Sequence, residues 1–447
     1  MQQPRPKTRL PQATDNILII VQNLPVPFDR RVWQESTSLR RAGFGVAVIC
    51  PTSKIHPKRY ERLEGVDIYR YPLLIEADTS IVGYFIEFVY CWLATLWLTL
   101  VAYRDRPFQV IQACNPPDIY FAIALLFRPL GVKFVFDYHD LCPELYIAKG
   151  HPKKGVVFRI LLFLERMTLR SADVVIATNE SYREIASSRG GVPDRKIVVV
   201  RSGPRREWSC LSNPQSELKQ GHKYLVVFVG QIGKQDGVDY LLRAISIYRR
   251  TYSKDTLFTI IGGGPLERAM RHLSAELGLT DQVHFTGRVS DEQLRSYLAT
   301  ADLCVDPDPW TEFTNRSTMN KIVEYMSAGR PTIAFDLLEH RRSAMGAARY
   351  VEPNNVAMFA GAMRELLEDK AEQARMSKVA AERFQQEMAW EISEEKLLHA
   401  YGKLLREVDF SAAKKVKKRN PLLLALARSV GRAVSGLAVA LFENGHA

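Results

Sequence analysis

Residues 257–270 read LFTIIGGGPLERAM and contain, in order, an apolar β-branched run, three glycines, a proline and an amphipathic helical pattern. A strand that passes into a helix through glycines is typical of a βα unit. The run KYLVVFVG at 223–230, with a helical pattern after it, begins an earlier unit of the same kind. Successive units of this kind predict a parallel sheet with helices on both faces.

Similar apolar runs recur along the whole chain, and helical patterns separate them. We predict strands at 16–22, 44–50, 66–71, 108–113, 133–137, 173–178 and 196–201, and then at 223–230, 257–264, 283–287, 302–306, 331–335 and 349–353. The fold class is therefore α/β, with two doubly wound Rossmann-like domains that face a cleft. Ligands of such sheets bind at the carboxyl ends of the strands.

The length of 447 residues predicts two or three domains, and the polar stretch 202–223 breaks the alternation of strands and helices. The predicted order is a disordered basic tail at 1–15, an N-terminal domain at 16–205, a linker at 206–222, a C-terminal domain at 223–385, closing helices at 386–410 and a basic amphipathic tail at 411–447.

The net charge of +12 is unusual for a soluble protein and favours an anionic partner, such as a phosphorylated substrate or a membrane surface. We find no signature of a nucleic-acid-binding module, so no nucleic-acid partner is expected. The six cysteines form no metal-binding pattern, which indicates a reducing compartment. The N-terminus lacks the apolar core of a signal peptide, so we expect a cytoplasmic protein.

Residues 81–103 are apolar and long enough to span a bilayer. Spanning would put predicted strands of one sheet on opposite sides of the membrane, so we expect a helix that is partly buried and partly pressed into one leaflet. A helix buried in the core is the alternative. The tail at 411–447 joins a lysine cluster to an amphipathic helix, which favours anionic lipid over a solvated tail. Peripheral association with the inner face of the membrane follows.

The stretch 316–331, RSTMNKIVEYMSAGRP, predicts one helix of about three turns that ends at Gly329. Ser317 or Thr318 is the expected N-cap. The apolar stripe comprises Met319, Ile322, Val323 and Met326, and the polar face comprises Ser317, Asn320, Lys321 and Glu324.

A lysine in the first turn of a helix makes the helix N-terminus an anion site. Glu324, one turn further along, would then reach sugar hydroxyls, which is the layout of a nucleotide. An ordinary surface helix with an exposed Lys–Glu pair is the alternative. Gly262, Gly263 and Gly264 would let backbone approach the same ligand, or they form a simple tight turn.

Several segments, in this order, resemble the two domains of family-4 retaining glycosyltransferases, which have the GT-B fold. The N-terminal segments are VQNLPVPFDRRVWQESTSLRRAGFGVAVICP and NPPDIYFAIALLFRPLGVKFVFDYHDLCPELY; the C-terminal ones are VFVGQIGKQDGVDYLLRAI, FTIIGGGPLERAM, VHFTGRVSDEQLRSYLATADLCVDP and TMNKIVEYMSAGRPTIAF. The resemblance covers about residues 16–408 and includes a subgroup that reads N-K-x-x-E-Y-M.

The resemblance implies roles for particular residues. Glu324 would contact the ribose, Lys321 the diphosphate, and His139 would lie near the transferred sugar; these three are the candidate catalytic residues. The other donor-binding candidates are Gly262, Gly263, Gly264, Thr286, Gly287, Arg288, Val289, Lys234, Asn320, Ser317 and Arg316. The acceptor-side candidates are Arg30, Arg31 and Asp140.

Three features of the sequence depart from the family pattern. Gln231 and Asp236 stand where the family has a phosphate-binding Arg and Lys, with Lys234 between them. Arg30 and Arg31 replace a glycine pair. Arg316 stands where the first glutamate of the family's E-x7-E element belongs, and it would add positive charge near the diphosphate.

The implied reaction is transfer of a sugar from a UDP- or GDP-sugar to a lipid-linked or polysaccharide acceptor in cell-surface glycan or exopolysaccharide synthesis, without a metal or other cofactor. We expect no metal at DPDP (306–309), although Asp-x-Asp binds metal in the other glycosyltransferase fold. The alternatives are a nucleotide-sugar 2-epimerase of the same fold and a non-catalytic nucleotide-binding partner subunit.

Overall fold

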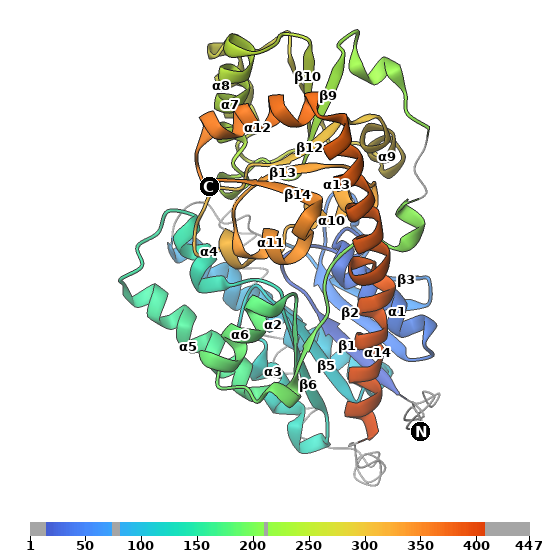
Figure 1. Ribbon diagram of the computed structural model, residues 1–447. Coiled ribbons are helices and arrows are strands. Elements are labelled where there is room, and N and C mark those ends of the chain that lie inside the picture. Colours follow the sequence, from blue (N-terminus) through green and yellow to red (C-terminus); the bar gives the residue numbers. More distant parts are fainter. Residues whose placement is uncertain (1–14, 74–80, 210–212, 407–447) are drawn as a thin grey trace, which may run out of the picture. The chain divides into compact units, whose positions relative to one another are not determined.

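The computed structural model describes residues 15–73, 81–209 and 213–406, which form two compact units (Figure 1). Unit 1 comprises the chain up to Pro143, Lys154–Val200 and the residues from Glu394 onward. Unit 2 comprises Glu144–Lys153 and Arg201–Ser393. Each unit is therefore discontinuous in sequence.

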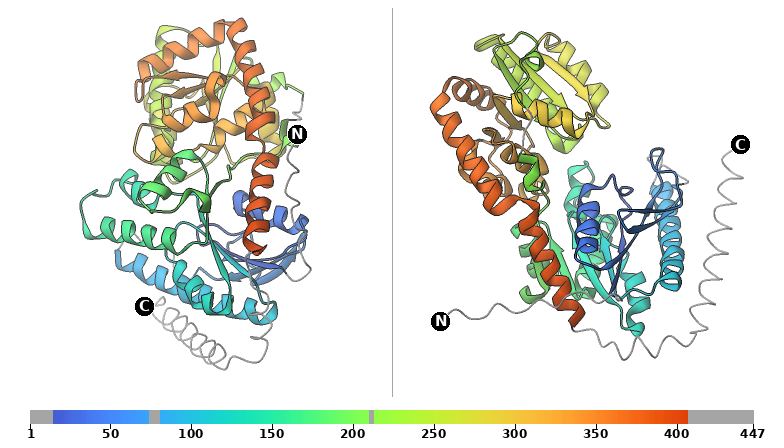
Figure 2. Two further views of the ribbon diagram at one scale, coloured as in Figure 1. Left: turned by 60° about the horizontal axis from the view of Figure 1, so that its bottom comes forward. Right: turned by 90° about the vertical axis from the view of Figure 1, so that its right-hand side faces the viewer.

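Unit 1 is built on an eight-stranded sheet with the order β3-β4-β2-β1-β5-β6-β7-β8. The strands are β1 (Asn16–Ile20), β2 (Gly45–Pro51), β3 (Tyr60–Leu63), β4 (Val66–Tyr71), β5 (Val110–Cys114), β6 (Lys133–Tyr138), β7 (Val174–Ala177) and β8 (Ile197–Val199). The helices are α1 (Arg30–Arg41), α2 (Ile81–Asp105), α3 (Phe121–Phe127), α4 (Cys142–Ala148), α5 (Val156–Ser171) and α6 (Glu180–Ser188). In Figure 2, α1 and α2 lie on opposite faces of this sheet.

The predicted strands of the first half are all present, and β3 is an additional one. It pairs antiparallel with β4, whereas the other neighbours in the sheet are parallel. Its sequence YERL is mostly exposed, so it lacks the apolar run by which the other strands are recognised. Charged residues are typical of such edge strands because they discourage pairing with another chain.

Unit 2 is built on a six-stranded, all-parallel sheet with the order β11-β10-β9-β12-β13-β14. The strands are β9 (Tyr224–Val229), β10 (Thr256–Ile261), β11 (Val283–Gly287), β12 (Leu303–Asp306), β13 (Thr332–Phe335) and β14 (Ala348–Val351). The helices are α7 (Val238–Thr251), α8 (Glu267–Glu276), α9 (Asp291–Thr300), α10 (Asn320–Ser327), α11 (Leu338–Ala344), α12 (Val356–Glu368) and α13 (Lys370–Arg383). A last helix, α14 (Trp390–Arg406), begins in unit 2 and has most of its residues in unit 1.

The predicted fold class is confirmed: each unit has an α/β sheet, which is parallel in unit 2 and parallel except for β3 in unit 1, and apolar residues of the strands form its core. In unit 2, Val226, Phe228, Phe258 and Ile260 are buried against α7 and α12. Because all strands of unit 2 are parallel, the loops that follow β9, β10, β11 and β12 gather at one edge of the sheet. This edge holds the candidate site of unit 2.

The unit boundaries differ from the predicted domains in two places. Residues Glu144–Lys153 belong to unit 2, and α14 begins in unit 2 but continues from Glu394 in unit 1. In unit 1, α14 donates a hydrogen bond from the Tyr401 hydroxyl to Gln112 of β5. The predicted tails at 1–15 (except Asp15) and 411–447, and residues 210–212 of the predicted linker, lie outside the described residues.

The apolar stretch predicted at 81–103 forms α2, which packs on β1, β2 and β4. In the described chain, one helix, at Ile86–Asp105, is apolar and long enough to cross a membrane, and 44% of its most apolar window is buried. Cys91, Thr95 and Thr99 are fully buried on the sheet side. A long helix in a soluble core passes the same test, so length and composition do not assign α2 to a bilayer.

Candidate functional site

Helix α10 carries three of the predicted site residues of unit 2, namely Asn320, Lys321 and Glu324. Its C-terminus is a Schellman motif: the amides of Gly329 (φ +60°) and Arg330 donate to the carbonyls of Met326 and Tyr325. The predicted end is thus confirmed, but the predicted N-cap is wrong. The N-cap residue is Met319, whose side chain makes no capping hydrogen bond. Ser317 Oγ does not cap α10 but donates to the carbonyl of Phe313 (2.8 Å).

Lys321 is buried, so its predicted place on an exposed polar face is wrong. Its ammonium contacts Asp308 Oδ1 at 2.5 Å and Asp306 Oδ1 at 3.3 Å, and lies 5.0 Å from the centre of the Phe228 ring. Both carboxyl groups belong to the DPDP segment: Asp306 is the last residue of β12, and Asp308 lies in the loop after it. Helix α10 is therefore enclosed on two sides.

The charges of this cluster are unequal. Burial opposes the Lys321 ammonium, but Asp306 and Asp308 hold its pKa above the usual range. Burial also opposes the Asp306 carboxylate, yet Lys321 and His340 keep its pKa low. Burial and the charge of Asp306 raise the pKa of Asp308 well above its usual range. The arrangement is a buried Lys321 ammonium in contact with two buried carboxyl groups, of which Asp306 has a lowered pKa and Asp308 a raised one.

The other predicted residues of this segment lie nearer the surface. Asn320, the first residue of α10, is exposed, and Glu324 is half-buried one turn along the helix. Arg316 is 41% exposed and lies 3.5 Å from Glu312 Oε2. Ser317 is buried. The accessible residues near the start of α10 are thus Asn320, Glu324 and Arg316, whereas the Lys321 ammonium is buried against Asp306 and Asp308.

The glycine turn after β10 packs against the loop after β9. Gly262 has a φ of +131°, and a Cβ atom there would lie 1.8 Å from the carbonyl oxygen of Gly230. A Cβ atom at Gly264 would lie 2.6–2.9 Å from the backbone of Ile232. These glycines therefore bring two backbone loops together at the carboxyl edge of the sheet, with Gly263 between them.

Substituting Gly262 with alanine should destabilise unit 2 by roughly 2–5 kcal/mol, because it combines a strained φ with a steric clash. Gly278 is the matched control, since it also has a positive φ (+69°) but no neighbour within 4 Å of an added Cβ. Gly278→Ala should cost only about 1–2 kcal/mol. Urea unfolding of both variants tests this, and equal losses would contradict the clash.

The predicted base-binding loop continues from β11. The Gly262 amide donates to the carbonyl of Gly287 (2.9 Å), which ties this loop to the glycine turn. Thr286 Oγ1 donates to the same carbonyl, and Val289 packs on the hydrophobic core. The Arg288 side chain lies near Gly263, since its Cγ would be 3.9 Å from a Cβ there. The structure thus brings the predicted residues of 262–264 and 286–289 together.

Lys234 lies on the short 3-10 helix Lys234–Asp236 after β9 and is exposed. Its ammonium is close to Gly150, where an added Cβ atom would lie 3.2 Å from Nζ. Asp236, in contrast, is buried and accepts a hydrogen bond from the Gly233 amide (3.0 Å). Burial raises its pKa. Asp236 therefore shapes the loop, and Lys234 is its exposed cation.

In unit 1, His139 follows β6 and is held from two sides. His139 Nδ1 lies 3.1 Å from Asp137 Oδ2. Asn115 Oδ1 accepts the backbone amides of His139 and Asp140 at 2.9 and 3.0 Å, and its Nδ2 donates to the carbonyl of Asp140 (2.6 Å). Burial opposes protonation of the imidazole, but the hydrogen bond and charge of Asp137 raise the pKa of His139 to about 9.

Arg31, predicted to face a substrate, is instead buried at the start of α1. Its guanidinium donates to both carboxylate oxygens of Asp137, the shortest contact being 2.6 Å, and to the carbonyl of Val200 (3.1 Å). Burial works against the Asp137 carboxylate, yet Arg31 and His139 hold its pKa well below the usual range. Arg30, the neighbouring candidate, is exposed.

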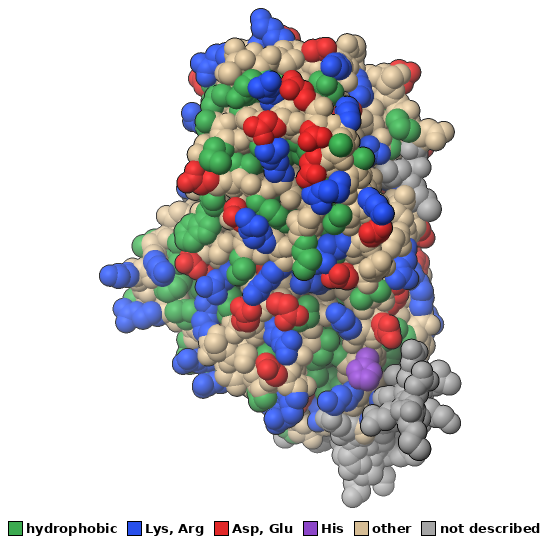
Figure 3. Space-filling view, viewed as in Figure 1, with side chains coloured by type: hydrophobic (Ala, Val, Ile, Leu, Met, Phe, Trp, Pro, Cys, Tyr) green, Lys and Arg blue, Asp and Glu red, His purple; other side chains and the backbone are tan. Residues whose placement is uncertain are grey.

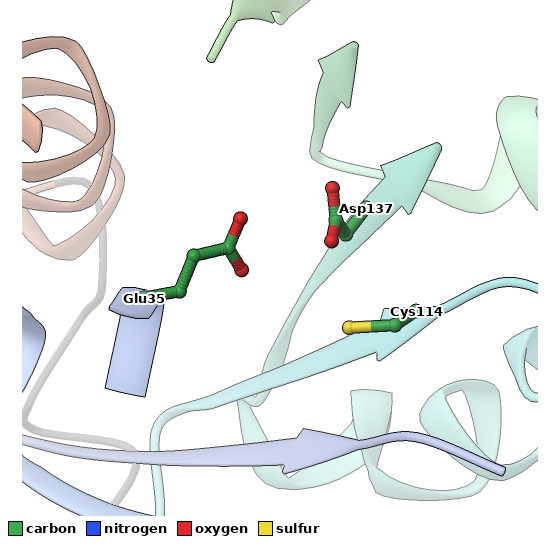
Figure 4. A group of neighbouring side chains, drawn as sticks. All are labelled: Glu35, Cys114 and Asp137. Carbon is green, nitrogen blue, oxygen red and sulfur yellow. The ribbon is translucent and has the colours of Figure 1, made fainter. Parts of the chain in front are cut away.

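Glu35 completes this buried network. It lies 3.1 Å from Arg31 Nη2 and accepts a hydrogen bond from Gln112 Nε2 (2.6 Å). Figure 4 shows the carboxylates of Glu35 and Asp137 and the thiol of Cys114 pointing into one space. Burial, with the charge of Asp137, raises the pKa of Glu35 to about 7. Asp137 therefore carries most of the negative charge opposite Arg31.

Two groups of described residues have the composition of a metal site: Glu35, Cys114 and Asp137 in unit 1, and Asp306, Asp308 and His340 in unit 2. In each group a buried cation already contacts both carboxylates. That cation is Arg31 in unit 1 and Lys321 in unit 2. Both arrangements are explained as ion-pair networks.

Sequence reasoning noted Asp306 and Asp308 only as part of DPDP and not as partners of Lys321. It missed the other residues that hold these networks, namely Glu35, Gln112, Asn115, Asp137, His340 and Tyr401. Two local signals pointed to them. Glu35 lies one turn after Arg31, the spacing of a helical ion pair, and Asp137 lies two residues before His139. The remaining partners are far apart in sequence and have no such signal.

Comparison with known proteins identifies the family. A model described as "Glycosyl transferase 4-like domain" matches residues 29–203, and one described as "Glycosyl transferases group 1" matches residues 223–369. An alpha-D-kanosaminyltransferase from Streptomyces kanamyceticus is 26% identical over 272 residues, which is 58% of this chain and 67% of that protein.

Solved structures share the fold. Sucrose-phosphate synthase from Thermosynechococcus elongatus has a TM-score of 0.71 at 18% identity and matches 88% of this chain and 99% of its own. HepE from Anabaena, solved with UDP-glucose, has a TM-score of 0.65 at 16% identity and matches 88% of this chain and 99% of its own. With family models on both sheets, the chain belongs to the glycosyltransferases of the GT-B fold, with a 4-like N-terminal and a group 1 C-terminal part.

Proposed function

We propose that the protein transfers a hexosyl or N-acetylhexosaminyl residue, with retention of configuration, from a UDP- or GDP-sugar to a lipid-linked or polysaccharide acceptor. The reaction serves cell-surface glycan synthesis, such as that of an exopolysaccharide. It takes place at the cytoplasmic face of the membrane and needs no metal ion or other cofactor. The donor binds to unit 2, and unit 1 supplies the acceptor side.

The observation that carries this proposal is the carboxyl edge of the sheet in unit 2. The N-terminus of α10, where Met319 makes no side-chain cap, lies on this edge together with the glycine-lined loops after β9 and β10. The amides at a helix N-terminus and close backbone loops are suited to a diphosphate. Lys234 and Arg316 supply exposed cations, and Glu324 would accept hydrogen bonds from the ribose hydroxyls.

Lys321 acts in this proposal through charge balance. Without its ammonium, the buried carboxylate of Asp306 would repel a diphosphate at the same edge. Because Lys321 offsets the charge of Asp306 and burial raises the pKa of Asp308, this cluster carries less negative charge than two exposed carboxylates would. The exposed cations would then neutralise the leaving diphosphate, which is the charge that develops during transfer.

His139 acts from unit 1. With a pKa of about 9, it is an imidazolium near neutral pH. It would donate a hydrogen bond to a sugar or acceptor hydroxyl and stabilise negative charge there. The described side chains suggest no enzymic nucleophile, so we favour front-face transfer, in which a donor phosphate oxygen accepts the proton of the attacking acceptor hydroxyl.

Thermal unfolding with a panel of nucleotides and nucleotide-sugars tests the donor site. A donor at 100 times its dissociation constant should stabilise the protein by about 2.7 kcal/mol and raise the melting temperature. Glu324→Ala should remove most of this shift and lower kcat/KM for transfer by at least about 100-fold, since it loses the ribose contact.

Glu368→Ala is the matched control, because Glu368 is 60% exposed on α12 of the same unit and pairs with Arg364. This variant should keep the donor-induced shift and the rate of transfer. The donor site would be rejected if Glu324→Ala transferred sugar at the rate of the control. Turnover of UDP-N-acetylglucosamine without any acceptor would contradict the proposed transfer and indicate an epimerase.

A further inference from the structure

Helix α5 exposes a row of large apolar side chains. Val156, Ile160 and Phe163 are 67%, 49% and 60% exposed. Their spacing of i, i+4 and i+7 places them on one stripe of the helix. Helix α3, which contacts α5, also exposes Leu125 and Leu126 (38% and 46%). Contiguous exposed apolar surface of this kind marks an interaction site.

The rotation of α5 is fixed from the opposite side. Glu165 is fully buried; its Oε1 accepts a hydrogen bond from the Tyr138 hydroxyl (2.5 Å) and contacts Arg189 Nη2 at 2.6 Å. Thr168 Oγ1 donates to the carbonyl of Asp118 (3.0 Å). At about 100° per residue, Glu165 points away from the stripe of Val156, Ile160 and Phe163. The exposed row is therefore held outward by buried polar bonds.

A row of arginines flanks the apolar stripe. Arg159, Arg166 and Arg170 are exposed and lie along one side of it, at spacings of seven and four residues. Glu165 is the one acidic residue in 154–171, and it points inward. Figure 3 shows Lys and Arg side chains beside hydrophobic ones over α5. The outer surface of α5 is therefore apolar and positively charged.

We propose that this face of α5, formed by Val156, Ile160, Phe163, Arg159, Arg166 and Arg170, docks on the surface of an anionic lipid bilayer. An amphipathic helix of this composition lies in the plane of the interface, with its apolar row among the acyl chains and its arginines at the headgroups. A second copy of the chain fits less well, because a two-fold contact would bring the same arginines together.

The inference deepens the proposed membrane association and rests on it for its biological meaning. It assigns docking to a helix that was not expected to bind lipid, whereas α2 uses much of its apolar surface on its own sheet. The tail at 411–447 remains a separate expectation.

Binding of the purified full-length protein to vesicles tests the proposal. The vesicles contain phosphatidylglycerol and phosphatidylethanolamine, or phosphatidylcholine alone, and flotation gives the bound fraction. The double variant Ile160→Glu/Phe163→Glu should bind anionic vesicles at least about tenfold more weakly than the unmodified protein. Replacing Arg159, Arg166 and Arg170 with glutamine should weaken binding by about fivefold per residue, and so by about 100-fold in all.

Matched variants separate this face from general effects of charge and polarity. Ile55→Glu/Met358→Glu alters two residues that are 77% and 52% exposed elsewhere. Arg349, Arg364 and Arg375 are exposed on unit 2, and replacing them with glutamine removes the same total charge. Both controls should bind vesicles as the unmodified protein does. The chain truncated before Lys414, with and without the α5 substitutions, shows whether the tail accounts for binding.

A probe on the helix keeps the test valid if the glutamate variants fold poorly. Ile160→Cys in a Cys210→Ser background, labelled with an environment-sensitive fluorophore, should show a blue-shifted emission on anionic vesicles. The remaining cysteines are buried. An unshifted label, or equal vesicle binding by the α5 and control variants, would overturn the proposal. Loss of a dimer in Phe163→Glu without loss of vesicle binding would do the same and indicate self-association.

The measurements contain no donor and no acceptor. A failure of lipid docking therefore leaves the proposed sugar transfer standing. Conversely, a protein that binds vesicles through α5 but shows no donor-induced stabilisation would contradict only the proposed function.

Discussion

Replacing Lys321 with methionine is expected to destabilise unit 2 by about 3–5 kcal/mol, the usual effect of removing one partner from a buried ion pair. Methionine retains the length of the side chain but leaves the fully buried carboxylate of Asp306 without its cation. The same change should abolish transfer. Urea unfolding and a transfer assay measure the two effects.

The double variant Lys321→Met/Asp306→Asn separates charge from packing. If the uncompensated carboxylate causes the loss, this variant should recover most of the stability. Lys219→Met is the matched control, because Lys219 pairs with Asp302 at 2.7 Å in the same unit but both are partly exposed (24% and 18%). It should cost only about 1 kcal/mol. Equal losses in Lys321→Met and Lys219→Met would contradict the buried pair.

Replacing Asp137 with asparagine is expected to lower the pKa of His139 from about 9 to its ordinary value of 6.5 or below. Burial opposes the imidazolium, and the charge that outweighs burial is lost in this variant. The fold should tolerate the change, since the charge of Asp137 no longer raises the pKa of Glu35 and this carboxylate can ionise beside Arg31.

The stability of the unmodified protein should depend on the protonation of His139. Because the folded pKa is raised, this contribution is complete below about pH 6.5 and is lost as the pH rises through about 9; its size is on the order of 3 kcal/mol. In Asp137→Asn this loss should disappear. If imidazolium is the form that stabilises transfer, the rate of this variant at about pH 7.5 should be lower than that of the unmodified protein, because most of its His139 is then neutral.

NMR titration of the His139 ring, assigned with a His139→Gln variant, measures the pKa directly. Glu35→Gln is the matched control, because Glu35 belongs to the same network but the His139 imidazole bonds Asp137. It should leave the pKa of His139 near 9. An unchanged pKa in Asp137→Asn would show that another group holds the imidazolium.

The fold could be predicted from the sequence because buried parallel strands consist of short runs of apolar residues. The runs LVVFV and FTII are each sufficient to predict a buried strand, and the glycines after them indicate the carboxyl edge of the sheet. β3 has no such signal, since it is a mostly exposed edge strand and two of its four residues are charged. The pairing of YERL with β4 becomes visible only in the folded sheet.

The candidate site was predictable in its location but not in its charges. The helical wheel placed Lys321 on the polar face because it assumes that a helix has one buried side. The end of β12 and the loop after it cover that side of α10, and they bring Asp306 and Asp308 to Lys321. Likewise, Arg31 and Asp137 meet across 106 positions in sequence. Local periodicity carries no information on such partners.

The hydrogen bond from Tyr401 to Gln112 has a consequence for synthesis of the chain. Gln112 binds Glu35, which contacts Arg31, so the last segment of the described chain completes a network that begins near its start. A ribosome that has finished the eight strands of unit 1 has not yet made Tyr401. In the nascent chain, the buried polar network of unit 1 therefore lacks the hydrogen bond from Tyr401 until all of unit 2 has been translated.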